Sequence, residues 1–109
     1  MKFVTLIVKD DDAGRLIDAL VAAGLRSTRL RSSGGFLRAR NATVILGVAD
    51  ERLDDVLRIV RATCRTRTRT MVPLPAVVEH VDVIGGATVE VDVGGATIFV
   101  TDIVHYEQI

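Results

Sequence analysis

The sequence predicts one small α+β domain, in which an antiparallel sheet carries two helices on one face. A strand, an acidic helix start, a helix and an alternating strand follow one another twice within the first 70 residues. Two β-α-β units of this length are typical of the ferredoxin-like (split β-α-β) arrangement. The chain has 109 residues, of which 49% are hydrophobic and 4% aromatic, so a single domain over residues 1–109 with an aliphatic core is expected.

The first unit begins with residues 2–8, a short run rich in β-branched residues that predicts a buried strand. Asp10, Asp11 and Asp12 then provide helix-start chemistry, and Gly24 is a natural stop. Residues 25–32 alternate and predict a second strand. The helix between them is expected to bury one face, made of Leu16, Ile17, Leu20 and Val21.

The second unit repeats this order. Residues 42–48 predict a third strand, a helix opens at Asp50, and residues 64–70 alternate again. The strands are too apolar for the sheet face without helices to be exposed to water. We therefore expect a homo-oligomer, a trimer, to cover that face. The second helix is expected to bury Leu53, Val56, Leu57 and Val60.

The last third of the chain predicts a long loop followed by a hairpin. Residues 70–86 contain both prolines and show no clear period, apart from a candidate strand over residues 76–83. A glycine pair precedes an alternating run twice, which predicts a β-hairpin with Gly94 and Gly95 at its tip. Residues 104–109 would form a last short strand or turn.

Composition excludes several classes of function. Basic and acidic residues number 14 each, so no net field favours nucleic acid or a membrane surface. One cysteine, Cys64, rules out an internal disulfide, and no Cys/His cluster has the spacing of a zinc site. The first apolar run meets aspartates too soon for a signal peptide, and no apolar run approaches 18 residues. We expect a cytoplasmic protein without membrane insertion.

The residues with reactive side chains do not form a catalytic pattern. The three aspartates lack the spacing of a calcium loop and are interpreted as a helix cap and solvated turn. His80 and His105 are expected at the surface, and Cys64 in the core. With no carboxylate pair, nucleophile-base motif or metal cluster visible, we expect neither an enzyme nor a cofactor.

Two groups of arginines are candidates for anion binding. Arg65, Arg67 and Arg69 would share one face of a strand, either to bind phosphate or an acidic partner or to protect a solvated edge strand from aggregation. The loop of residues 32–41, SSGGFLRARN, is flanked by further arginines. Its backbone amides could form an anion nest and Phe36 could stack on a base, whereas the alternative is a loop that packs at an interface.

The segments LRSTRL, SSGGFL, RNATVILGV and GGATIFV resemble the PII-like cyclic di-AMP receptor family, and the resemblance extends from Lys2 to Gln108. The long loop follows the second helix, as in the cyclic di-AMP group, and not the second strand, as in nitrogen-regulatory relatives. The resemblance implies a PII-like homotrimer with a ferredoxin-like core that binds its ligand between neighbouring subunits.

The resemblance also implies roles for particular residues. Two positions differ from the family: Ser33 stands where threonine is usual, and Arg40 stands where glycine precedes the asparagine. The implied ligand contacts are Arg26 and Thr28 at phosphates and ribose, Gly35, Phe36 and Leu37 around the adenines, Asn41 and Gly47 as polar and backbone contacts, and Gln108 at the pocket rim.

The function implied is signalling by a non-enzymatic sensor. Cyclic di-AMP, a small-molecule second messenger, would bind between subunits, order the flanking loops and alter docking to an unknown downstream protein. One alternative is a PII-like protein that binds another nucleotide, ATP or ADP. Another is a regulatory trimer without a small ligand, whose arginine rows dock an acidic partner.

Overall fold

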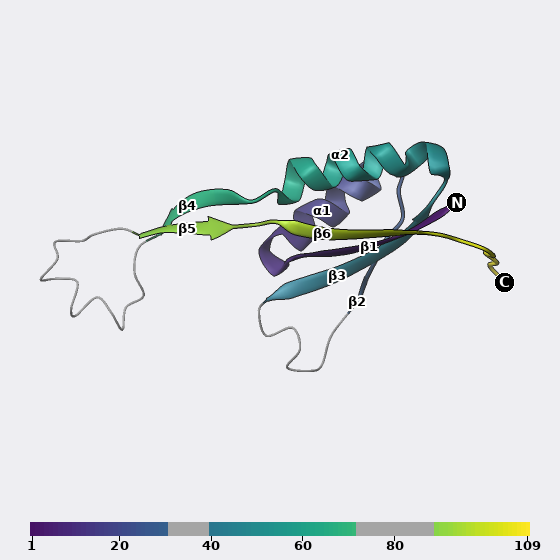
Figure 1. The fold of residues 1–109 in the computed structure, drawn as a ribbon, viewed down its shortest axis with the longest axis horizontal. Coiled ribbons are helices and arrows are strands. Elements are labelled where there is room, and N and C mark those ends of the chain that lie inside the picture. The colour runs from purple at the N-terminus through teal and green to yellow at the C-terminus, as the bar shows by residue number, and fades with distance from the viewer. Residues whose placement is uncertain (31–39, 72–88) are drawn as a thin grey trace, which may run out of the picture.

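A four-stranded antiparallel sheet with two helices on one face forms the body of the molecule (Figure 1). The computed structural model describes residues 1–30, 40–71 and 89–109. The sheet has the strand order β2-β3-β1-β6, so its two central strands come from the two predicted units. The strands of this sheet are β1 (Lys2–Lys9), β2 (Thr28–Leu30), β3 (Asn41–Val48) and β6 (Ala96–Asp102).

Both predicted helices are confirmed. Helix α1 (Asp10–Ala22) follows β1 directly and ends before Gly24, whose φ of 76° lies in the left-handed region that glycine adopts without strain. Helix α2 (Leu53–Cys64) follows a single 3-10 turn, η2 (Asp50–Arg52). The predicted apolar face of α1 was wrong at Val21, which is 64% exposed because the next helical position after buried Leu20 is rotated by about 100°.

The core lies between the helices and one face of β1 and β3. Side chains alternate along both strands, and every second residue is buried against the helices. The opposite face of the sheet carries no helix, and we call it the helix-free face. The buried residues of the two strands are Val4, Leu6 and Val8 of β1 and Ala42, Val44, Leu46 and Val48 of β3, and they pack with Leu16, Leu20, Val56 and Val60 of the helices.

The fourth strand of the sheet is not the predicted one. Residues 64–70 were expected to complete the second β-α-β unit, but β4 (Arg67–Met71) pairs with β5 (Val89–Val93) in a separate two-stranded sheet. We call this two-stranded sheet the arm. The edge position beside β1 belongs to β6. A strand of alternating arginine and threonine has no apolar side to offer the core, whereas Ile98 of β6 packs against it.

The predicted hairpin at Gly94 and Gly95 is also wrong. β5 pairs with β4 and β6 pairs with β1, so the two glycines carry the chain from the arm into the main sheet. Their φ values are 81° and 96°, and the Gly95 amide donates a hydrogen bond to the Cys64 carbonyl at the end of α2. A Cβ at Gly94 would come within 2.6 Å of the Arg65 carbonyl oxygen. Close backbone approach therefore explains the glycine pair.

The tail leaves the sheet after β6. The Ile103 amide donates to the Met1 carbonyl (3.0 Å), and residues 103–109 then extend away (Figure 1). A short strand or turn was predicted over residues 104–109, and the structure has no strand there. The candidate strand over residues 76–83 lies outside the described residues. Neither of the described helices is long and apolar enough to cross a membrane.

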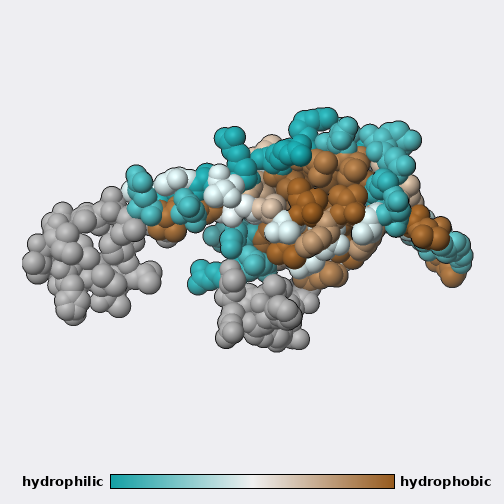
Figure 2. Space-filling view, viewed as in Figure 1, coloured by the Kyte–Doolittle hydropathy of each residue, from teal (hydrophilic) through white to brown (hydrophobic). Residues whose placement is uncertain are grey.

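The helix-free face carries large apolar side chains. Phe3 of β1 is 39% exposed and Phe99 of β6 is 55% exposed, and both alternate away from the core. Ile7 and Ile45 on the same face are half-buried. Hydrophobic residues also gather over the middle of the molecule below α2, in the region of the main sheet (Figure 2). A sheet face of this composition is expected to be covered by a further protein surface.

Candidate functional site

The predicted ligand residues that lie in strands share the helix-free face. Thr28 of β2 is opposite Ile45 of β3, and Gly47 of β3 is opposite Phe3 of β1. Asn41 lies an even number of residues before Ile45 and before Gly47 in β3, so all three β3 side-chain positions face the same side. Directly opposed residues in an antiparallel pair project to the same side of the sheet. The structure therefore places Thr28, Asn41 and Gly47 on the side away from the helices.

These residues lie toward different ends of the face. Asn41 and Gly47 are six residues apart on β3, a separation of about 20 Å along an extended strand. Thr28 lies nearer the Gly47 end. Gln108 follows the end of β6, where Asp102 is opposite Lys2, so the tail also starts from the Gly47 end.

The remaining predicted contacts are less constrained by the structure. Arg26 is exposed just before β2, and exposed Gln108 accepts a hydrogen bond from the Tyr106 hydroxyl (3.3 Å). Gly35, Phe36 and Leu37 lie outside the described residues, as does Ser33. The segment that contains these four residues connects β2 to β3 and therefore re-enters the sheet at Asn41.

Asn41 lines a hollow of about 230 Å³ on the helix-free face. Lys9 is directly opposite Asn41, and Thr97 is opposite Ile7, so the ends of β3, β1 and β6 meet there. An amide can read the edge of a purine, and an ammonium group can pair with phosphate. The hollow therefore combines two groups suited to a nucleotide. Sequence reasoning missed Lys9 and Thr97, because only strand register brings them to Asn41.

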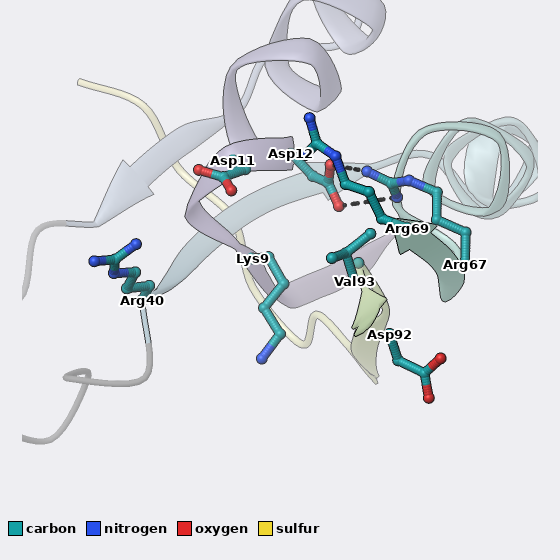
Figure 3. A pocket seen from close by; sticks show the side chains of 9 residues that line it. Lys9, Asp11, Asp12, Arg40, Arg67, Arg69, Asp92 and Val93 are labelled. Carbon is teal, nitrogen blue, oxygen red and sulfur yellow. Dashed lines mark hydrogen bonds and ion pairs between the residues drawn. The ribbon is translucent and has the colours of Figure 1, made fainter. Parts of the chain in front are cut away.

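A second hollow, of about 220 Å³, adjoins the first through Lys9 and Gly94 (Figure 3). Lys9, at the end of β1, and Arg40, just before β3, line one side of it, and Arg67 and Arg69 line it from the arm (Figure 3). Its acidic lining residues are Asp11, Asp12 and Asp92. The hollow lies where the arm, the first turn of α1 and the start of β3 come together.

Arg40, which the resemblance led us to expect as a departure from the family pattern, has a left-handed backbone with φ of 60°. Its carbonyl accepts a hydrogen bond from the Asp10 amide (2.7 Å), which holds this conformation against the start of α1. Glycine adopts this region without strain, whereas arginine does not. Backbone conformation therefore gives a physical reason for the glycine that the resemblance leads us to expect at this position.

Asp12 anchors the arm to the main domain. The carboxylate is only 1% exposed and accepts hydrogen bonds from Arg15 Nη2 (2.7 Å) and Arg67 Nη2 (2.8 Å). Figure 3 shows the Arg67 guanidinium directed at this carboxylate. The hydrogen bond to Asp12 raises the pKa of Arg67 above its ordinary value. A buried charge of this kind needs such partners.

The predicted cap and solvated turn at the three aspartates is thus only partly right. All three lie in the first turn of α1, where their charge is favourable, but the N-cap residue is Lys9 and no side chain caps the helix. Asp10 forms an ion pair with Arg29 (2.8 Å), and Asp12 is buried. The periodicity of the helix alone could not indicate that an arginine 55 residues away completes the environment of Asp12.

Only two of the three arginines predicted to share a strand face lie in the strand. Arg67 and Arg69 lie two residues apart in β4 and line the same hollow, but Arg65 precedes the strand as the C-cap of α2. Arg67 is half-buried and paired with Asp12, so this part of the row is not a fully solvated edge. Arg69 is exposed.

The expectations for Cys64 and His105 are confirmed. Cys64 is fully buried, and burial raises the pKa of its thiol. His105 is exposed beside Glu107 (3.2 Å). His80 lies outside the described residues. Among residues 1–30, 40–71 and 89–109, no group of three or more potential ligands is arranged to hold a metal ion.

Comparisons with known proteins agree with this architecture. The model of the family described as "Cyclic-di-AMP receptor" matches residues 1–109. A crystal structure of a functionally unknown protein from Pediococcus pentosaceus ATCC 25745 is similar to this chain, with a TM-score of 0.77 and 33% sequence identity over 99% of this chain and 96% of that one. The family consists of non-enzymatic signalling proteins, and membership implies cyclic di-AMP binding. The chain belongs to the cyclic-di-AMP receptor family.

Proposed function

We propose that cyclic di-AMP binds on the helix-free face between subunits of a PII-like homotrimer, and that bound ligand orders the adjoining loops to change docking of a downstream protein. The placement of Asn41 beside Lys9 in an open hollow on this face carries the proposal. The amide would read an adenine edge, and the ammonium group would pair with a phosphate.

The shape of a single protomer supports a site between subunits. Small-molecule sites usually enclose most of the ligand surface, whereas Thr28, Asn41 and Gly47 are spread over one face of a sheet. A second copy packed on exposed Phe3 and Phe99 would supply the opposing wall. The same contact would remove these rings from water.

The tail supports a contribution from a neighbouring subunit. Residues 103–109 extend away from their own sheet, so Gln108 is positioned to reach another copy (Figure 1). We assign Asn41 and Gln108 of one site to different subunits. Arg26, Thr28, Gly35, Phe36, Leu37 and Gly47 complete the proposed set of contacts.

The proposed mechanism is a shift in loop populations. The segment between β2 and β3 enters the sheet at the hollow that contains Asn41, and the arm borders the adjoining hollow. A ligand that contacts one arrangement of these segments more strongly than another favours that arrangement. The change in their surface would be the signal that the downstream protein reads.

Titration calorimetry with cyclic di-AMP, with cyclic di-GMP and ATP alongside at the same salt concentration, tests the ligand. We expect one cyclic di-AMP per subunit and no comparable heat from the other two nucleotides. Light scattering of the same sample tests the trimer. A response to ATP alone, or to none of the three, would contradict the assigned ligand.

Complementation tests the placement between subunits. Asn41→Ala and Gln108→Ala are each expected to bind cyclic di-AMP weakly as uniform assemblies. After the two variants are unfolded together and refolded, mixed assemblies contain sites with an intact Asn41 from one subunit and an intact Gln108 from another. Recovery of tight binding supports the assignment. If both residues came from one subunit, every site would keep one of the two substitutions, and the mixed assemblies would still bind cyclic di-AMP weakly.

A further inference from the structure

A third hollow, of about 340 Å³, lies at the base of the arm on the helical side of the molecule. Three of its five lining residues are arginines, and no acidic residue lines it: the residues are Arg15, Ala62, Thr63, Arg65 and Arg67. The arginines come from α1, from the C-cap of α2 and from β4. The fold therefore brings Arg15 to two arginines, Arg65 and Arg67, that lie much later in the chain.

One carboxylate faces this group of charges. Asp12 accepts hydrogen bonds from Arg15 and Arg67, and both bonds use a single buried carboxyl group. Arg65 forms no side-chain ion pair or hydrogen bond with any of the described residues. Asp12 thus pairs with two of the three arginines, and the excess positive charge lies at the wall of an open hollow.

Three carbonyls at the end of α2 already accept hydrogen bonds, which weakens their repulsion of a second anion. The carbonyls at a helix C-terminus carry partial negative charge and would repel an anion if they were free. Here Arg15 donates to the Thr63 carbonyl (3.0 Å), the Gly95 amide donates to the Cys64 carbonyl, and Arg67 donates to the Arg65 carbonyl (3.1 Å). These oxygens are therefore already occupied.

Donors remain for a ligand. A guanidinium group has five N–H donors in a planar fork that matches a tetrahedral oxyanion. All five donors of Arg65 are without a partner among the described residues, as are Nε and Nη1 of Arg15. Both side chains are exposed at the hollow, so an anion can enter without displacing Asp12.

We propose that the hollow formed by Arg15, Arg65 and Arg67 binds a phosphate dianion, as free hydrogen phosphate or as the terminal phosphate of a nucleotide. This site is separate from the proposed cyclic di-AMP site, which lies on the other face of the sheet. Anion binding here bridges α1 and the base of β4, and it adds to the connection that Asp12 already makes between the arm and the main domain.

The site is tested by NMR titration of the full chain with sodium phosphate at constant ionic strength, with sodium chloride as the blank. We expect saturable shifts of the Arg15 and Arg65 Nε–Hε signals. Arg65→Gln is expected to weaken phosphate binding by about tenfold or more, because a charge-assisted hydrogen bond is lost. The matched control is Arg61→Gln, which removes an exposed arginine of α2 outside the hollow and should change the affinity by less than about twofold.

Further measurements separate the alternatives. Arg65→Lys keeps the charge without the fork and is expected to bind with intermediate affinity, which keeps the test valid if the glutamine variant folds poorly. A parallel titration with AMP distinguishes a phosphate ester from free phosphate, and binding of either one that depends on Arg65 supports the site. Equal affinity in wild type and Arg65→Gln, or shifts also produced by chloride, would each overturn the proposal.

Discussion

Arg67 donates hydrogen bonds to both carboxylate oxygens of Asp12, at 2.8 Å to Oδ1 and 3.4 Å to Oδ2. The contact connects β4 of the arm to the first turn of α1. A two-stranded sheet is marginally stable by itself in water. The ion pair therefore gives the arm a fixed base on the main domain.

Asp12→Asn tests this anchor. The amide keeps the size of the side chain but loses the charge that Arg15 and Arg67 bind, so we expect unfolding in urea to require about 2 kcal/mol less free energy. The matched control is Asp11→Asn, which lies in the same helical turn but is exposed. Both variants lose the favourable interaction with the helix dipole, so the difference between them reports the buried contacts. Equal losses of unfolding free energy in the two variants would contradict the proposed role of Asp12 in anchoring the arm.

The order of elements in the domain could be predicted, because it rests on local periodicity. Alternation in β1 and β3 and the apolar spacing in α1 follow directly from which side chains must face the core. The position of β6 beside β1 could not be predicted in this way. β4 and β6 both alternate, and although β6 is the more apolar of the two, its local pattern does not indicate which edge of the sheet it joins.

Residues of the candidate site could be predicted only where they belong to a sequence motif of the family. Resemblance selected Thr28, Asn41 and Gly47, and strand register then placed them on one face. Lys9 joins Asn41 through pairing of β1 with β3, and no local pattern marks it. The environment of Asp12 likewise depends on tertiary contacts, which a charge run in the sequence does not reveal.

Cys64 predicts a pH dependence of stability at alkaline pH. Burial raises the pKa of the thiol in the folded chain, whereas an unfolded thiol titrates near about 8.5. The thiol's contribution to stability is therefore fully present below about pH 8.5 and is lost as pH rises toward the folded pKa, with a slope of up to about 1.4 kcal/mol per pH unit.

Urea unfolding at several values from pH 7.5 to about pH 10 measures this slope. Cys64→Ala is the control, because it lacks the thiol and retains the other alkaline titrations, including that of Lys2, whose pKa is raised by Asp102. Wild type should lose stability more steeply than the variant. Parallel curves would show that the thiol ionises as easily in the folded chain as in the unfolded chain.

Arg40→Gly tests the backbone at the start of β3. Glycine removes the steric cost of φ near 60°, partly offset by the greater entropy of the unfolded chain, so we expect a gain in stability of up to about 1 kcal/mol. Arg40→Asn should give part of the gain, because asparagine tolerates this region, and Arg40→Ala should give none. Thermal unfolding of the three variants measures the order. A gain in the alanine variant equal to that in the glycine variant would show that the side chain, and not the backbone, is the source.

Gly47→Ala separates ligand contact from folding. A Cβ at this position would lie 3.5 Å from Ile103 Cδ1 and 3.9 Å from Met1 Cε, which is ordinary van der Waals contact. The protomer therefore accommodates alanine, and its stability should not fall, since alanine also restricts the unfolded chain. If a dinucleotide approaches the backbone here, the added methyl group should weaken cyclic di-AMP binding by at least about tenfold, since overpacking a close contact typically costs more than 1 kcal/mol.

Calorimetry on Gly47→Ala, with urea unfolding and light scattering on the same sample, measures both effects. Wild-type affinity in a stable, correctly assembled variant would remove Gly47 from the proposed site, whereas a loss of affinity together with a loss of assembly would place Gly47 at the contact between subunits.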